Sequence, residues 1–196
     1  QSVEAFFTHI PGFKVAMPST ASDAAGLLRT AIRDNNPVMF IEHKALYATS
    51  EEVPDDPEFA IPFGQAAIRR QGKDVTIIAT SLMVGRALEA AEKLAAEGIE
   101  AEVIDPRTLL PLDLDTLLNS IEKTGRAVVV HEAHKNNGVG AEIASQIMES
   151  GFKYLDAPVA RLGAKPCTLP FSLVLENAVV PGVEDIHAAA KQVCYK

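Results

Sequence analysis

Tryptophan is absent from this chain, and only two of its 196 residues are cysteines. Cys167 and Cys194 lie far apart without C-x-x-C spacing, which indicates a reduced intracellular setting rather than a disulfide framework. No apolar run approaches the roughly 20 residues that a membrane-spanning helix needs, and no signal-peptide pattern occurs. The net charge of −8 argues against a general nucleic-acid-binding protein.

Hydrophobic residues make up 47% of the chain, which is enough for one good core and a small second unit. They fall in short segments that alternate between strand and helix patterns. Strands are expected at residues 15–18, 38–41, 75–79, 101–104, 127–130 and 159–162, and amphipathic helices after Thr20 and at residues 84–95, 114–121, 139–148 and 183–193. This alternation predicts a doubly wound α/β sheet.

The most specific stretch is residues 101–115, which read A-E-V-I-D-P-R-T-L-L-P-L-D-L-D. Its first four residues form an apolar strand pattern. Pro106 is expected to end that strand, because proline supplies no N–H to a sheet ladder. Pro111 and Asp113 are then expected to open a helix, whose apolar face contains Leu114, Leu117, Leu118 and Ile121.

The chain divides into three parts. Residues 1–49 hold one strand–helix–strand unit, residues 50–62 form a linker rich in proline and acidic residues, and residues 63–196 hold a complete α/β domain. We expect the linker to be extended and exposed. One strand–helix–strand unit buries too little surface to be a domain. We therefore expect the chain to be truncated, with the rest of its first unit preceding Gln1.

The end of the first predicted helix brings several oxygen atoms together at residues 31–36, A-I-R-D-N-N. The last carbonyls of a helix have no partner within it, and the helix dipole makes that end partially negative. With the carboxylate of Asp34 and the amide oxygen of Asn36, they would suit a weakly polarising cation rather than zinc. An ordinary helix end capped by Asn and Asp fits the same residues, and the pattern alone favours this simpler interpretation.

Two further motifs lie near the third helix of the domain. His131-Glu132-Ala133-His134 follows a predicted strand but lacks the H-E-x-x-H spacing of zinc proteases, so we expect a solvated loop histidine rather than a ligand. Gly138-Val139-Gly140 would let a backbone approach a phosphate, although close packing of a loop on a helix explains it equally well. With no nucleophile elbow and no P-loop, we assign no catalytic and no cofactor-binding residue.

Six strings occur in a fixed order: Q-S-V-E-A-F-F, P-S-T-x-x-D-A, A-I-R-D-N-N-P-V, D-P-R-T-L-L-P-L-D, G-V-G-A-E-I and L-D-A-P-V-A-R. Together they resemble the beta subunit of thiamine-diphosphate-dependent 2-oxoacid dehydrogenases, the first component of complexes of the pyruvate dehydrogenase type. The resemblance covers essentially the whole chain. It implies that residues 1–49 end a pyrimidine-binding domain and that residues 63–196 are a transketolase C-terminal-type domain.

The resemblance also implies where the chemistry lies. In the family, a histidine in an H-S-Q string acts at the substrate end of the cofactor, and Gln1 resembles the Q of that string. This histidine and the glutamate that activates the pyrimidine would precede Gln1, and the alpha subunit mainly holds the diphosphate and its metal. We therefore expect thiamine diphosphate and Mg²⁺ to be bound by the intact assembly and not by these residues.

One site does carry over from the family, a structural potassium site. Its ligands match Ala31, Ile32, Asp34 and Asn36, which contribute backbone and side-chain oxygens. The resemblance therefore favours a monovalent cation where the residue pattern alone favoured an ordinary helix cap.

The implied partners are an alpha subunit and a second beta subunit in a heterotetramer, and the subunit-binding domain of the acyltransferase. Residues 179–195 have the aliphatic, weakly charged character of an interface, and also that of an ordinary core helix. The expected location is cytoplasmic, with the mitochondrial matrix as the alternative. We expect no binding of nucleic acid or membrane.

The implied activity is oxidative decarboxylation of a 2-oxoacid, pyruvate in the first place, with acyl transfer to a lipoyl arm. Acetoin cleavage by the sister complex is a second enzyme interpretation, and a non-catalytic α/β assembly module is a third. We expect these 196 residues alone to be inactive.

Overall fold

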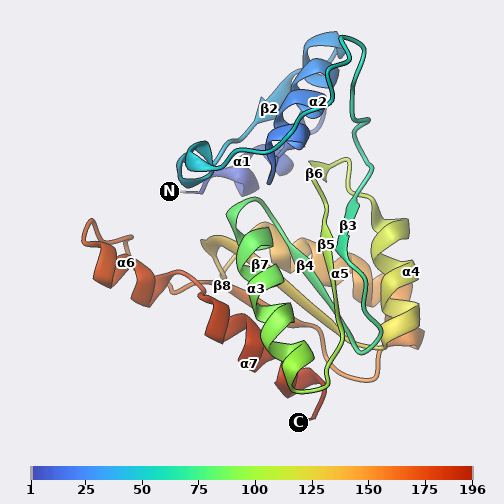
Figure 1. Cartoon of the computed structure of the whole chain (residues 1–196), viewed down its shortest axis with the longest axis vertical. Coiled ribbons are helices and arrows are strands. Elements are labelled where there is room, and N and C mark those ends of the chain that lie inside the picture. Colours follow the sequence, from blue (N-terminus) through green and yellow to red (C-terminus); the bar gives the residue numbers. More distant parts are fainter. Residues whose placement is uncertain (1, 196) are drawn as a thin grey trace.

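The computed structural model describes residues 2–195, which form a mixed α/β fold with two sheets. A small N-terminal unit stands beside a larger layered domain (Figure 1). The strands are β1 (Lys14–Ala16), β2 (Val38–Phe40), β3 (Ala67–Arg70), β4 (Val75–Ala79), β5 (Ala101–Asp105), β6 (Thr108–Leu110), β7 (Ala127–His134) and β8 (Ala160–Ala164). The α-helices are α1 (Glu4–Thr8), α2 (Ala21–Arg33), α3 (Leu82–Ala96), α4 (Leu114–Thr124), α5 (Val139–Gly151), α6 (Leu173–Val179) and α7 (Val183–Val193).

The N-terminal unit contains the predicted strand–helix–strand, with β1 and β2 parallel and α2 between them in sequence. Helix α2 begins after Thr20, as predicted, and Thr20 caps it, because its hydroxyl accepts the Asp23 N–H at 3.1 Å. On α2, Leu27 is buried, but Leu28 and Ile32 are 45% and 76% exposed. Strand β2 is an edge strand and is half-buried, whereas its continuous apolar run is typical of a strand covered on both faces.

A strand that we did not predict completes the smaller sheet. Strand β6 follows the Asp105-Pro106-Arg107 corner and pairs antiparallel with β1, so the sheet order is β2-β1-β6. The backbone N–H of Met17 also donates to the carbonyl of Arg107 at 2.8 Å. Pro111 lies outside helix α4, which Asp113 caps by accepting the Thr116 N–H at 3.2 Å. The stretch 101–115 therefore contributes a strand to each sheet.

The larger domain is a five-stranded sheet in the order β3-β5-β4-β7-β8, in which only the β3–β5 pairing is antiparallel. Every residue of β4 and β5 is buried, as their apolar sequences predict for strands covered on both faces. Helices α3 and α7 pack into the core cluster on one face, and α4 and α5 into the cluster on the other. The doubly wound α/β prediction is confirmed, and β3 is an edge strand that the sequence did not reveal.

The segment 50–62 has no helix or strand, yet it is tied to α2 along its length. Arg29 donates to the carbonyls of Asp56 and Phe59 at 2.8 and 3.0 Å, and the Thr30 hydroxyl donates to the Ile61 carbonyl at 2.7 Å. Most of its residues are exposed, but the Ile61 side chain is buried. The segment is therefore a strap bound to the N-terminal unit rather than a free linker.

Candidate functional site

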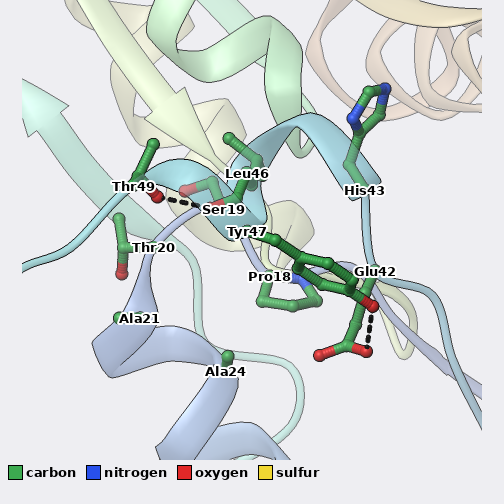
Figure 2. Close-up of a pocket in the computed structure, with 10 residues that line it drawn as sticks. All are labelled: Pro18, Ser19, Thr20, Ala21, Ala24, Glu42, His43, Leu46, Tyr47 and Thr49. Carbon is green, nitrogen blue, oxygen red and sulfur yellow. Dashed lines mark hydrogen bonds between the residues drawn. The ribbon is translucent and has the colours of Figure 1, made fainter.

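Two neighbouring pockets share Glu42 and His43 in their linings. The first lies within the N-terminal unit, and the second lies between that unit and the larger domain. The first, with a volume of about 190 Å³, lies between the start of α2 and the 3-10 helix Lys44–Ala48. There the Tyr47 hydroxyl donates to the Glu42 carboxylate at 2.9 Å, and this hydrogen bond raises the pKa of Tyr47. The His43 ring points away from this pair (Figure 2).

The second pocket, about 370 Å³ in volume, is lined by residues of both units. On its wall the Nε2 atom of His43 and a carboxylate oxygen of Glu132 are 2.5 Å apart. Because the Nδ1 atom of His43 accepts the Ala45 N–H at 3.2 Å, the ring proton is on Nε2, which donates to Glu132. This hydrogen bond from His43 lowers the pKa of Glu132, against the opposing effect of burial. The pair fixes one wall of the pocket.

Glu4, in the short helix α1, lines the same pocket and is only 1% exposed. Its Oε2 atom has no hydrogen-bond partner among residues 2–195. Burial raises the pKa of the Glu4 carboxyl, and the negative charge of Glu132 adds to this effect. Sequence reasoning missed this residue, because nothing local distinguishes an acid that tertiary packing buries from one on the surface.

An ion-pair network joins the two units beside the first pocket, which Ser19 lines. Arg69, on β3, contacts the buried carboxylates of Asp23 and Asp105, the latter at 2.9 Å. Arg107 forms an ion pair with Asp23 at 2.9 Å. The Ser19 hydroxyl donates to Asp105 at 2.5 Å. Burial raises the pKa of Asp105, and its contacts with Ser19 and Arg69 oppose this shift. The network holds buried charge in pairs, which is the arrangement that avoids an uncompensated ion.

His131 is not a solvated loop histidine, so our prediction for it was wrong. Strand β7 continues through the whole His131–His134 motif, and His131 is 1% exposed. Burial lowers its pKa to about 4, so the imidazole is neutral at pH 7. Neither ring nitrogen has a hydrogen-bond partner among residues 2–195. His131 therefore has no arrangement for acid–base chemistry in this chain.

The G-V-G motif is explained by the same histidine. A Cβ atom on Gly138 would lie 2.5 Å from Cε1 of His131, and one on Gly140 would lie 2.5 Å from Cδ2. Gly163 on β8 closes a third side, where a Cβ would lie 2.9 Å from Cε1. Of the two interpretations of the motif, close packing accounts for these glycines, and a phosphate site is not needed to explain them.

The four predicted cation ligands lie at the end of α2, where the chain turns back on itself. The Ala31 carbonyl accepts the Asp34 N–H at 3.3 Å. One carboxylate oxygen of Asp34 accepts from the backbone and side-chain N–H groups of Asn36, at 2.8 and 2.9 Å. The other pairs with Lys14, and that hydrogen bond is the main reason why the pKa of Asp34 falls to about 2. The cation site, which includes Ile32, stays a prediction.

The larger of the two pockets does not suit thiamine diphosphate. Within residues 2–195, no group of three or more His, Cys, Asp or Glu side chains is arranged to hold a metal ion. The larger of the two pockets carries several carboxylates, which would repel a diphosphate. Gln1, the residue that resembles part of the H-S-Q string, lies outside the described residues.

Among the helices of residues 2–195, none has the length and hydrophobicity that a membrane span requires.

Comparison with known proteins gives consistent matches along the chain. Residues 64–186 match the family described as transketolase, C-terminal domain, and residues 1–50 match the transketolase pyrimidine-binding domain. A split-gene transketolase, described as an inactive beta4 tetramer, has a similar structure. It gives a TM-score of 0.81 at 27% identity and covers all of this chain and 62% of its own.

Two curated relatives show the range of similar enzymes. The pyruvate dehydrogenase E1 component subunit beta of Rhizobium meliloti is 46% identical over 196 residues, which cover all of this chain and 43% of that protein. The acetoin:2,6-dichlorophenolindophenol oxidoreductase subunit beta of Cupriavidus necator is 50% identical over 192 residues, covering 98% of this chain and 56% of that protein. The chain thus spans about half the length of the curated relatives it matches. It belongs to the transketolase C-terminal domain family, preceded by the end of a transketolase pyrimidine-binding domain.

Proposed function

We propose that this chain is the C-terminal part of the beta subunit of a thiamine-diphosphate-dependent 2-oxoacid dehydrogenase. The observation that carries the proposal is similarity at 46–50% identity, over nearly the whole chain, to beta subunits of pyruvate and acetoin enzymes. The intact protein would decarboxylate a 2-oxoacid, pyruvate in the first place, and pass the acyl group to a lipoyl arm. Thiamine diphosphate and Mg²⁺ would be held by the intact assembly of alpha and beta subunits.

Acetoin cleavage is the second candidate, supported by the 50% identity to the acetoin enzyme of Cupriavidus necator. The two activities differ in substrate charge, because a 2-oxoacid is an anion and acetoin is neutral. The full-length beta chain, combined with its alpha partner, should be assayed against pyruvate, branched-chain oxoacids and acetoin with a dye acceptor. Turnover of acetoin alone would select the second candidate, and turnover of none of these would support a non-catalytic assembly module.

The proposed role in this assembly is to build subunit contacts with the alpha subunit, a second beta subunit and the acyltransferase's subunit-binding domain. Helix α7 does not support this role, because its apolar side chains are buried in the core of this chain. The residues that favour it lie on and before α6, where Phe171, Leu173, Val174 and Leu175 are all more than half exposed. Figure 1 shows α6 projecting from the body of the domain. An exposed apolar group of this kind is typical of an interface.

A potassium ion at the end of α2 is the remaining part of the proposal. Backbone oxygens of Ala31 and Ile32 and side-chain oxygens of Asp34 and Asn36 would bind it. Since the ammonium of Lys14 pairs with Asp34, the ion would have to share that carboxylate with Lys14 or displace it. The cellular compartment of the protein stays an expectation, because the similar proteins include bacterial and mitochondrial forms.

A further inference from the structure

The pocket of about 370 Å³ between the two units has a chemistry that the proposed activity does not use. We call it the acid pocket and define it by Glu4, Met17, Ile41, His43, Glu132 and Leu169, which are among its lining residues. Its volume is within the range of small-molecule sites in proteins, about 300–1,000 Å³.

The charges on its lining are strongly one-sided. Four carboxylates line it, those of Glu4, Glu42, Glu132 and Glu176, against the single ammonium of Lys44. The field of such a lining disfavours an anion and favours a cation. Acidic side chains that cluster on a protein surface are often simply exposed to solvent. The number of charges by itself is therefore not evidence of a binding site.

The second observation is the state of Glu4. This side chain is 1% exposed, and its Oε2 atom accepts no hydrogen bond from residues 2–195. A buried carboxylate oxygen without a donor is costly, and a donor within the pocket would relieve that cost. The neighbouring acid cannot provide one, because Glu132 already accepts the proton on Nε2 of His43. The Oε2 atom of Glu4 therefore lacks an N–H donor that a ligand could supply.

The rest of the lining narrows the class of ligand. Side chains of Val3, Met17, Ile41 and Leu169 provide apolar surface beside the acids. Within residues 2–195 no three His, Cys, Asp or Glu side chains are placed to hold a metal ion. A ligand with one cationic donor end and a short hydrocarbon stem matches both parts of the lining.

We propose that the acid pocket binds a small organic cation, a primary ammonium or guanidinium on a short hydrocarbon stem. Glu4 and Glu132 accept hydrogen bonds from its N–H groups, and the stem lies against Met17, Ile41 and Leu169. The inference is independent of the substrate of the proposed dehydrogenase, because it requires neither the cofactor nor the alpha subunit.

Isothermal titration calorimetry on the full-length protein tests this with three probes of the same size: n-butylammonium, n-butanol and butyrate. We expect saturable binding of n-butylammonium, about ten-fold or more tighter than n-butanol, and no binding of butyrate, because a charge-assisted hydrogen bond adds to the shared apolar contact. Equal affinities for n-butylammonium and n-butanol, or no saturable binding of n-butylammonium, would overturn the proposal without any mutation.

A pair of variants then locates the site. Glu4→Gln removes one of the four negative charges of the pocket and keeps the shape of the side chain. It should weaken the binding of n-butylammonium about ten-fold and leave the binding of n-butanol unchanged. Glu92→Gln changes the net charge equally on the exposed face of α3 and should leave both affinities unchanged. An equal loss in the two variants would mean diffuse attraction to an acidic protein and would contradict a site at Glu4. Circular dichroism and the melting temperature report whether Glu4→Gln is folded; if it is not, the three-probe comparison on the wild type decides.

Discussion

The hydroxyl of Ser19 donates a hydrogen bond to the carboxylate of Asp105 at 2.5 Å, although the two residues are 86 positions apart in the sequence. Ser19 follows β1 of the N-terminal unit, and Asp105 ends β5 of the larger sheet. The contact lies beside Arg69, which also donates to Asp105, at 2.9 Å. These three residues connect the two units through polar contacts to the buried carboxylate of Asp105, and not through apolar packing alone.

Replacing Arg69 with leucine should destabilise the protein strongly. Asp23 and Asp105 are 1% and 0% exposed, and without the guanidinium they would carry poorly compensated charge in the interior. Breaking a buried pair in this way typically costs about 3–5 kcal/mol. The neighbouring Arg70→Leu is the control, because Glu100, its partner in an ion pair, has a 44% exposed side chain and such pairs contribute about 1 kcal/mol or less. Urea unfolding measures the free energy of unfolding of the two variants. Equal losses in Arg69→Leu and Arg70→Leu would show that the buried network contributes no more than an exposed ion pair.

Replacing Gly140 with alanine should also destabilise, through the His131 ring. The new methyl would lie 2.5 Å from Cδ2 and 2.7 Å from Nε2 of a ring that is packed on several sides. Overpacking of this kind costs about 1–3 kcal/mol. Gly85→Ala is the matched control, since it lies in α3 with nothing within 4 Å of the added carbon. It should stabilise by about 0.5–1 kcal/mol, so thermal melts of the two variants should shift in opposite directions.

Acid should weaken the fold through His131. Its pKa is about 4 in the folded protein against an ordinary value of 6.5, so the unfolded chain binds this proton first as the pH falls. The contribution of the neutral His131 ring to the free energy of unfolding is fully present above pH 6.5. It declines by roughly 3 kcal/mol as the pH falls from 6.5 to about 4. Urea unfolding at pH 7.5, 6.0 and 4.5 measures this decline. His131→Asn should be less stable at pH 7.5 but should show a flatter pH dependence, and an unchanged slope would contradict the assignment.

The potassium proposal predicts that the melting temperature of the full-length protein rises with added potassium. Asp34→Ala removes the one formal negative charge among the four proposed ligands, so it should abolish most of that rise. Thermal melts in matched potassium and tetramethylammonium chloride separate a specific ion from general ionic strength. If wild type and Asp34→Ala respond equally, the residues at the end of α2 form only the Asn36 and Lys14 contacts that the structure shows.

The α6 surface predicts an effect on assembly without an effect on folding. Val174 is 78% exposed, so Val174→Asp should leave the melting temperature of the isolated chain nearly unchanged while weakening association with partner subunits about ten-fold. Val53→Asp, in the strap along α2, places the same charge away from α6 and is the control. Analytical ultracentrifugation of the assembled proteins measures the difference, and a loss of folding in Val174→Asp would instead assign α6 to the core.

The elements that could be predicted from the amino-acid order are those with a local cause. Strand β4 is apolar at nearly every position and is buried throughout, as its pattern predicts. Thr20 caps α2 and Gly125 takes the left-handed conformation at the end of α4, because caps depend on the few residues around a helix end. The ordered family strings identified the fold before any contact was known.

Other features depend on contacts between residues far apart in the chain, and these could not be predicted from local sequence. Strand β6 is three residues long, and only its pairing with β1 makes it a strand. The burial of His131 requires Gly163 as well as the nearby G-V-G motif, and the burial of Glu4 requires the larger domain beside α1. A single sequence shows which side chains can be charged, but whether such a group is desolvated and left without a donor depends on what long-range packing places around it.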